Sequence, residues 1–436
     1  MSNLRQPTGA SISAPGSRVG SFRWVVCGLL FAATTINYID RQVLGILAPD
    51  LQHEIGWSEL DYGRIVIAFQ LSYAVMMLFW GRILDRIGTK LGLAIAVGWW
   101  SLAAMGTAFA RSAISFGAAR FMLGVGEAAN FPASIKTVAE WFPKSERAFS
   151  TGIFNAGTNV GAVVAPIAVP LIAAVWGWQA AFILTGAIGF IWLIVWWMMY
   201  SPVETHPRLS SAEREYIHDG ADELVTEKTR LSTILGKRQL WAFAMGKLMT
   251  DPVWWFFLTW LPDYFKKKWA LDIKKSWVHL VTIYAIITVL SIVGGWLTGY
   301  LKGRGWSVTR ARKTGMFIFA CCVLPIFLVT SVGPWTAVVL LGIAGAAHQA
   351  WSANLFTTTS DMFPKRAVAS LVGVGGMAGS FGGIAFPLLA GTLLDRMGTS
   401  GYAVLFAICG SAYLVAFALN HLLAPRFEPI ELPPGH

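Results

Sequence analysis

Six ionisable side chains lie within long apolar stretches of this sequence, and they are the first candidates for chemistry. They are Asp40, Arg41, Arg120, Glu127, Lys247 and Asp251. A charged side chain in the middle of a membrane-spanning helix costs about 3 kcal/mol or more, so each of them requires a functional or structural reason. Acids in such places can exchange protons, and cations can bind anions.

The first pair, Asp40 and Arg41, is adjacent in the motif Asn37-Tyr-Ile-Asp-Arg41. Neighbouring residues on a helix point about 100° apart, so the two side chains need not pair with each other. We expect one to face a proton path and the other a cavity. The alternative is an ion pair at the end of the helix, near the membrane surface.

The second pair, Arg120 and Glu127, is separated by seven residues. This spacing places both side chains on one helix face, about 10 Å apart along the axis. Gly124 and Gly126 lie between them and allow another helix to approach closely. Both charges could therefore exchange partners with groups on a neighbouring helix. The alternative is a static buried pair that fixes the packing.

The third pair, Lys247 and Asp251, is four residues apart and is followed by Pro252, Trp254 and Trp255. Proline can break a helix at this point. A broken helix rich in aromatic residues is typical of a binding wall, and Lys247 and Asp251 form a possible charge pair there. The alternative is a helix cap, with the tryptophans serving only in packing.

These residues require membrane-spanning helices to position them. The chain has 436 residues, of which 55% are hydrophobic and 13% charged, and a mean hydropathy of +0.57. A spanning helix needs about 20 mostly apolar residues. The lengths of the apolar runs predict an all-α membrane protein of twelve helices rather than a barrel. The predicted spans are 23–46, 61–83, 90–110, 113–138, 148–174, 177–200, 240–265, 278–302, 311–332, 334–358, 366–394 and 400–424.

The net charge of +11 indicates membrane topology rather than nucleic-acid binding. Basic residues collect in alternate loops, and positive loops face the cytoplasm, so both termini are predicted to be cytoplasmic. The first outer loop is acidic. The loop at 263–277 contradicts this rule, because it is placed outside and yet contains five lysines. The basic residues of the inner loops are Arg82, Arg86, Lys90, Lys144, Arg147, Lys302, Arg304, Arg310, Arg312, Lys313, Lys365 and Arg366, and those of the outer loop are Lys266, Lys267, Lys268, Lys274 and Lys275.

The second half of the chain repeats the first. Trp141-Phe-Pro-Lys144 matches Met362-Phe-Pro-Lys365, and Gly161 with Pro166 matches Gly382 with Pro387, each at a difference of 221 (382 − 161). Earlier spans match at 213, as in Pro49-Asp50 and Pro262-Asp263 (262 − 49). Such parallel repeats are a known transporter architecture, in which two six-helix bundles are related by a pseudo-two-fold axis along the membrane normal.

The duplication divides the chain and shows where its halves differ. We predict a disordered cytoplasmic N-terminus at 1–22, bundles at 23–200 and 240–424, a cytoplasmic linker at 201–239 and a tail at 425–436. Within the linker, Ser210 or Ser211 could cap a short helix. The charges are not duplicated, since Glu127 corresponds to His348, Asn159 to Ser380 and Arg120 to Leu341. This asymmetry suggests that coupling and substrate contact are divided between the halves.

The first hairpin on the cytoplasmic side carries a glycine-rich basic motif, Gly81-Arg-Ile-Leu-Asp-Arg-Ile-Gly-Thr-Lys90. We interpret it as a gate latch made by Gly81, Asp85, Arg86, Gly88 and Lys90. The alternative is a loop that only sets topology. The four cysteines lie in apolar spans without a Cys/His cluster, so no disulfide framework, metal site or cofactor is indicated.

Together these motifs resemble the major facilitator superfamily. The stretch Gly81–Lys90 matches the loop signature of the superfamily. The Asn-Tyr-x-Asp-Arg start and the Trp-Phe-Pro-x-x-Glu-Arg147 motif resemble its anion:cation symporter branch. Asp251-Pro-Val-Trp-Trp-Phe256 is similar to bacterial hexuronate transporters. The resemblance implies that Asp40 and Glu127 are protonation sites, that Arg120 couples to Glu127, that Arg41 holds the substrate carboxylate, and that Tyr38 and Tyr73 line the cavity.

We therefore expect a monomeric carrier in the bacterial inner membrane that moves a sugar-acid anion, such as glucuronate or galacturonate, with protons or sodium. Its substrate contacts are predicted to be Arg41, Tyr38, Tyr73, Asn155, Asn159, Trp254, Trp255, His348, Gln349 and Ser380. Close relatives have asparagine where this chain has Ser380. A histidine such as His348 is more often a satisfied core residue.

Alternatives are an aldonate, aldarate or aromatic-acid symporter, a drug exporter, a sensor or a membrane enzyme. The arginines argue against the exporter, the short linker against the sensor, and the absence of a nucleophile–base set against the enzyme.

Overall fold

The computed structural model describes residues 20–218, 231–271 and 273–430, and the regular structure within them is helical. Residues 1–19 of the predicted N-terminal segment 1–22, residues 219–230 of the linker and the end of the tail, 431–436, lie outside the described residues. The first half comprises α1 (Phe22–Ile55), α2 (Glu59–Ile87), α3 (Thr89–Gly106), α4 (Ala113–Glu127), α5 (Asn130–Trp141), α6 (Lys144–Trp176) and α7 (Trp178–Met199). The linker holds α8 (Ser211–His218) and α9 (Leu231–Leu235). The second half comprises α10 (Arg238–Trp269), α11 (Ile273–Gly303), α12 (Val308–Val323), α13 (Pro334–Met362), α14 (Lys365–Met397) and α15 (Gly401–Leu423).

Among the described residues, seven stretches are long and apolar enough to cross a membrane. One of them, Leu371–Leu423, covers both α14 and α15. The helices outside these stretches include α2, α4, α5, α10 and α13, several of which carry the polar and charged residues discussed above. The chain is thus a multi-pass helical membrane protein whose most polar helices are recognised least by hydropathy.

Some corresponding helices of the two halves begin and end at positions that differ by the offset of the sequence repeat. α6 and α14 both have 33 residues, and both ends differ by 221 (365 − 144 and 397 − 176). The single helix α13 covers the interval of α4 and α5 together at the same offset (334 − 113 and 362 − 141). The first half is interrupted at residues 128–129 because Pro132 has no N–H to donate to the carbonyl of Ala128. Glu127 therefore ends a helix, whereas its counterpart His348 lies inside one.

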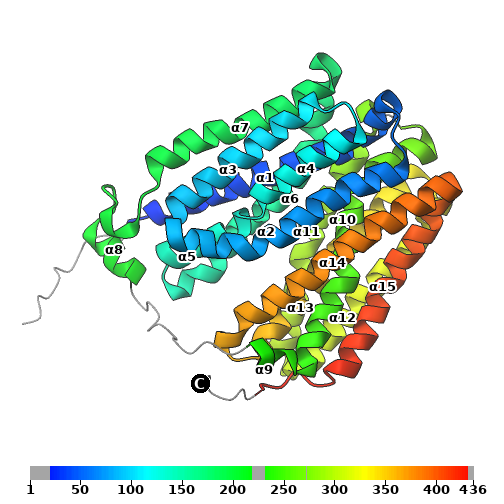
Figure 1. The fold of residues 1–436 in the computed structure, drawn as a ribbon. Coiled ribbons are helices and arrows are strands. Elements are labelled where there is room, and N and C mark those ends of the chain that lie inside the picture. The colour runs from blue at the N-terminus through cyan, green and yellow to red at the C-terminus, as the bar shows by residue number, and fades with distance from the viewer. Residues whose placement is uncertain (1–19, 219–230, 272, 431–436) are drawn as a thin grey trace, which may run out of the picture.

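The two halves of the sequence meet at the end of the molecule that is far from the linker helices (Figure 1), here called the linker-distal end. α1 packs on α10 there, and α2 packs on α14. Glycines permit both contacts. A Cβ on Gly45 would meet the Leu258 carbonyl oxygen at 2.8 Å, and one on Gly391 would meet the Glu59 carbonyl oxygen at 2.7 Å. The backbones of the two halves are therefore in direct contact.

Ion pairs reinforce the linker-distal end. The Lys266 ammonium lies 2.6 Å from the Asp50 carboxylate, and Lys267 pairs with Glu59. The Asp395 carboxylate accepts the backbone N–H groups of Glu59 and Leu60 at 2.8 and 3.0 Å, which satisfies the first turn of α2. Lysines that contradict the positive-inside rule thus neutralise acids of the other half. The side chains of Lys274 and Lys275 lie outside the described residues.

The linker is fastened to the first half through Arg23. Its guanidinium lies 2.7 Å from Glu146 and 3.2 Å from Glu213 of α8, and it stacks over Tyr216. Hydrogen bonding to Arg23 lowers the pKa of the Glu146 carboxyl below its ordinary value. The Ser210 hydroxyl accepts the N–H of Glu213 at 3.1 Å, which confirms the predicted cap.

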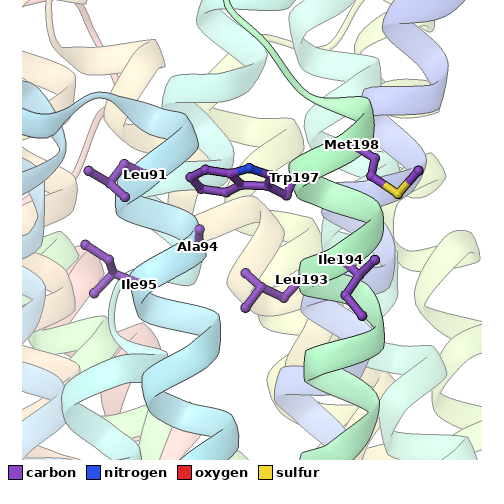
Figure 2. A pocket seen from close by; sticks show the side chains of 7 residues that line it. All are labelled: Leu91, Ala94, Ile95, Leu193, Ile194, Trp197 and Met198. Carbon is purple, nitrogen blue, oxygen red and sulfur yellow. The ribbon is translucent and has the colours of Figure 1, made fainter.

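The loop motif lies at the opposite end from the ion pairs between the halves. The Lys90 ammonium lies over the Trp197 ring, 5.2 Å from its centroid, and the side chain of Asp85 is outside the described residues. Side chains of α3 and α7 line an apolar hollow of about 540 Å³ that begins at Leu91, next to Lys90. Figure 2 shows that aliphatic side chains, Trp197 and Met198 line it. The indole N–H of Trp197 is the one polar side-chain group among these lining residues, which is too few to hold a sugar.

Replacing Gly391 with valine should force the linker-distal ends apart, because the added side chain meets the α2 backbone. Spin labels on exposed cysteines introduced at Arg64 and Arg396 would measure the separation of α2 and α14. We expect longer distances in Gly391→Val. Gly376→Val is the matched control, since nothing lies within 4 Å of a Cβ at Gly376 on the same helix. An unchanged distance distribution in folded Gly391→Val would contradict the contact.

Candidate functional site

A polar cavity of about 240 Å³ lies between the two halves. The first half contributes side chains from α1, α5 and α6, and the second half contributes side chains from α10 and α13. The lining residues are Tyr38, Phe131, Asn155, Thr158, Lys247, Asp251, Trp254, Trp255, His348, Gln349, Ser352 and Phe356. Amides, hydroxyls and indole rings together with one ion pair suit a small hydroxylated anion.

The Lys247–Asp251 pair lies in the wall of this cavity. The two side chains are one helical turn apart on α10, with Nζ 2.7 Å from Oδ2. The ammonium also lies over the Phe356 ring, 4.5 Å from its centroid. The predicted break at Pro252 is wrong, because α10 runs on through it. Gly382 of α14 packs against the Pro252 ring and the Leu248 carbonyl, which supports the helix where proline removes its hydrogen bond.

His348 lies beside this pair and is held on two sides. Its Nδ1 is 2.6 Å from the Tyr413 hydroxyl, and its ring stacks on Trp254 with an interplanar angle of 4°. The position that the duplication aligns with Glu127 is therefore a fixed aromatic surface of the cavity.

Arg41 is enclosed in an aromatic cage next to the cavity. Its Nε and Nη2 donate to the Glu127 Oε2 at 2.9 and 2.8 Å, and Nη2 also lies 3.3 Å from the Asn37 Oδ1. Four rings surround the guanidinium at 4.9–5.1 Å, contributed by Tyr38, Phe69, Tyr73 and Trp255. Trp255 comes from the second half, so it closes the cage across the interface.

Arg120 and Asp40 lie deeper in the first half. Arg120 donates to the backbone carbonyls of Asp40 and Arg41 at 3.4 and 2.9 Å. In the described structure Glu127 thus bonds with Arg41 rather than with Arg120. Both carboxylate oxygens of Asp40 are buried without a hydrogen-bond partner among the described residues. Thr185 of α7 is close enough to interact with them, but its hydroxyl donates to the Phe182 carbonyl. Asp40 therefore faces α7 and not the cavity.

The structure brings together much of the predicted set. Six of the predicted substrate contacts line the cavity, and Tyr73 belongs to the cage around Arg41. The six are Tyr38, Asn155, Trp254, Trp255, His348 and Gln349. Asn159 and Ser380 are not among the described lining residues, and the Ser380 hydroxyl donates to the Gly376 carbonyl of its own helix. Thr158 and Ser352 were missed, although helical spacing from Asn155 and His348 could have indicated them. Gly124 packs on the Phe69 carbonyl of α2 as predicted.

Comparison with known families agrees with this geometry. The sequence profile described as Major Facilitator Superfamily matches residues 30–387. The chain belongs to this superfamily. Two solved transporter structures share its fold. A bacterial homolog to the human lysosomal transporter Spinster, in an inward-facing and occupied conformation, has a TM-score of 0.73 at 18% identity, covering 94% of this chain and 98% of that one. The D-xylose–proton symporter has a TM-score of 0.70 at 16% identity, covering 93% and 99%.

Three proteins that are similar in sequence are named as transporters of sugar acids. The "Hexuronate transporter" of Escherichia coli (strain K12) is 32% identical, covering 90% of this chain and 91% of that protein. The "Galacturonate transporter" of Dickeya chrysanthemi is 33% identical, covering 73% and 92%. The "D-galactonate transporter" of Escherichia coli O6:H1 is 29% identical, covering 94% and 97%. The predicted resemblance to hexuronate transporters is confirmed, and these relatives are transporters rather than enzymes.

The aromatic cage gives a prediction about stability. Trp255→Phe keeps a ring over Arg41, whereas Trp255→Leu keeps apolar volume but removes the ring face. A cation over an aromatic face contributes about 0.5–2 kcal/mol when desolvated. We expect Trp255→Leu to unfold at a lower temperature than Trp255→Phe, as measured by light scattering or circular dichroism in detergent. Equal unfolding temperatures would show that Trp255 serves only as apolar packing.

Proposed function

We propose that this protein is a proton-coupled symporter that takes up a hexuronate such as glucuronate or galacturonate. The observation that carries the proposal is the cavity between the halves, which combines a cation with amides, hydroxyls and tryptophans. A sugar acid offers a carboxylate for the cation, hydroxyls for Asn155 and Gln349, and a ring face for Trp254 or Trp255. The names of the similar proteins support the same substrate class.

The architecture that fits this function is twelve spans in two six-helix bundles, related by a pseudo-two-fold axis along the membrane normal. In this proposal α4 and α5 together form one span, and both termini face the cytoplasm of a bacterial cell. The shared helix bounds of α6 and α14 support the axis. The linker-distal end would then face outward, closed by Lys266–Asp50 and Lys267–Glu59.

Coupling would run through the buried acids of the first half. Both donors of Arg41 converge on Oε2 of Glu127, and Oε1 has no partner among the described residues. A proton on Glu127 would weaken its hold on Arg41, which must leave the cage if it is to touch a carboxylate. Asp40, without a partner of its own, would be a second proton site. Arg120 would hold the backbone of α1 between them.

Alternating access would exchange contacts at the two ends of the molecule. Opening the linker-distal end requires breaking its ion pairs and separating α2 from α14. In the opposite conformation, the loop motif around Gly81, Arg86, Gly88 and Lys90 would come together with the second half. Because surface ion pairs contribute little individually, the two conformations can lie close in free energy.

A test of coupling uses proteoliposomes and radiolabelled glucuronate or galacturonate. We expect an imposed inward pH gradient to drive accumulation by the wild-type protein. Asp40→Asn should abolish accumulation against a concentration gradient while retaining exchange of internal for external substrate, because a fixed neutral side chain cannot carry a proton. Accumulation driven equally by sodium alone, or undiminished in Asp40→Asn, would contradict proton coupling through Asp40.

An aldonate or aldarate is the second candidate substrate, because one similar protein is a "D-galactonate transporter" and another a "Probable galactarate/D-glucarate transporter GarP". The cavity of about 240 Å³ lies slightly below the usual range for small-molecule sites. We expect a thermal-shift panel to rank hexuronates above linear acids and far above neutral glucose, which lacks the charge. A greater shift with galactarate would favour the dianion instead.

A further inference from the structure

Two cavities meet at Trp255, and they differ in what they can hold. The larger one, of about 240 Å³, is lined by Lys247. The smaller one, of about 20 Å³, is lined by Arg41 and Arg120. A space of that size holds about one water molecule and cannot admit a sugar. Trp255 lines both cavities and separates them.

Access to a cation therefore differs between the two halves. Arg41 is enclosed by four rings and bonded to Glu127. Lys247 is the single cationic side chain among the described residues that line the larger cavity. A carboxylate that enters this cavity in the present conformation meets the ammonium of Lys247, while Arg41 stays behind the indole of Trp255.

Asp251 is the group that such a carboxylate must displace. It holds the Lys247 ammonium at 2.7 Å, and its Oδ2 packs against Gly379 of α14, where a Cβ would collide with it. The titratable groups facing it are Lys247 on its own helix, Tyr38 from α1, His348 from α13 and Tyr413 from α15. None of the three from the other helices is a permanent cation.

The net charge of the occupied cavity determines whether a proton is bound together with the substrate. Adding an anion to one ammonium and one carboxylate leaves a net charge of −1 in a buried space, which is costly. A proton taken from solvent by Asp251 restores neutrality, because the ammonium then pairs with the substrate carboxylate and Asp251 becomes a neutral acid. The step forms one ion pair, breaks one and consumes one proton.

We propose that Lys247 receives the carboxylate of the substrate and that Asp251 binds a proton when it releases Lys247. This proposal rests on the proposed function and adds a substrate receptor and a proton site in the second half, beside the acids of the first. Neutral sugars of the same shape are rejected because they leave the Lys247–Asp251 pair intact.

The experiment measures binding of the best hexuronate from the panel to the purified full-length protein by isothermal titration calorimetry. Titrations in buffers with different ionisation enthalpies count the protons taken up. We expect Lys247→Gln to weaken binding about tenfold or more, and Lys247→Arg to retain part of the affinity. Asp251→Asn should reduce the proton count by one and flatten the pH dependence, which for one linked proton reaches about tenfold per pH unit. The exposed Lys302→Gln is the matched control.

The possible failures are distinguishable. Hexuronate binding that survives in Lys247→Gln but is lost in Arg41→Gln would overturn this inference and leave the proposed function in place. A wild-type proton count in Asp251→Asn would overturn the role of Asp251. Absence of any sugar-acid binding to the wild-type protein would overturn the proposed function and this inference with it. Unfolding temperatures of each variant would separate loss of binding from loss of fold.

Discussion

The ion pair between Arg41 and Glu127 joins α1 to α4 in the interior of the first half. Much of the surrounding structure helps to offset the cost of burying these two charges. Both side chains are almost fully buried, with exposures of 6% and 0%. Such a pair persists only when its remaining hydrogen-bonding capacity and its surroundings are favourable. Tyr38, Phe69 and Tyr73 provide rings from the first half, and Trp255 provides the fourth from the second. The charge thus binds the halves together through an aromatic side chain.

The second half pairs its buried charges in a different way. Its charges, Lys247 and Asp251, lie on one helix and pair within a single turn, so they need no partner from elsewhere. This makes the pair independent of the closure between the halves, whereas the cage of Arg41 loses its Trp255 wall if the halves separate. The duplicated scaffold therefore carries one charge site that depends on the interface and one that does not.

The sequence predicted what depends on local pattern. The duplication at 221 anticipated that α6 and α14 would match, and both of their ends differ by 221, although the predicted spans 148–174 and 366–394 are shorter than the helices. The spacing of Lys247 and Asp251 placed their side chains together. The sequence alone could not show which ion-pair partners meet across helices. Arg120 and Glu127 share a helix face, yet Glu127 bonds with Arg41, because tertiary packing chooses among several cations within reach. Likewise, the alignment with Asn159 and the family resemblance suggested that Ser380 contacts the substrate, but its hydroxyl donates to a carbonyl of its own helix.

The lysines at the end of α10 show why a charge rule based on single loops can mislead. The rule counts basic residues near the membrane and ignores what faces them. Lys266 and Lys267 face Asp50 and Glu59, which lie more than 200 positions away in the sequence. Their charge is therefore neutralised in the folded state, and the resulting ion pairs hold the two halves together. In the proposed alternating access these contacts must break, and the partial exposure of Lys266 and Asp50 keeps the contribution of their ion pair small. A stronger buried latch would hold the carrier in one conformation.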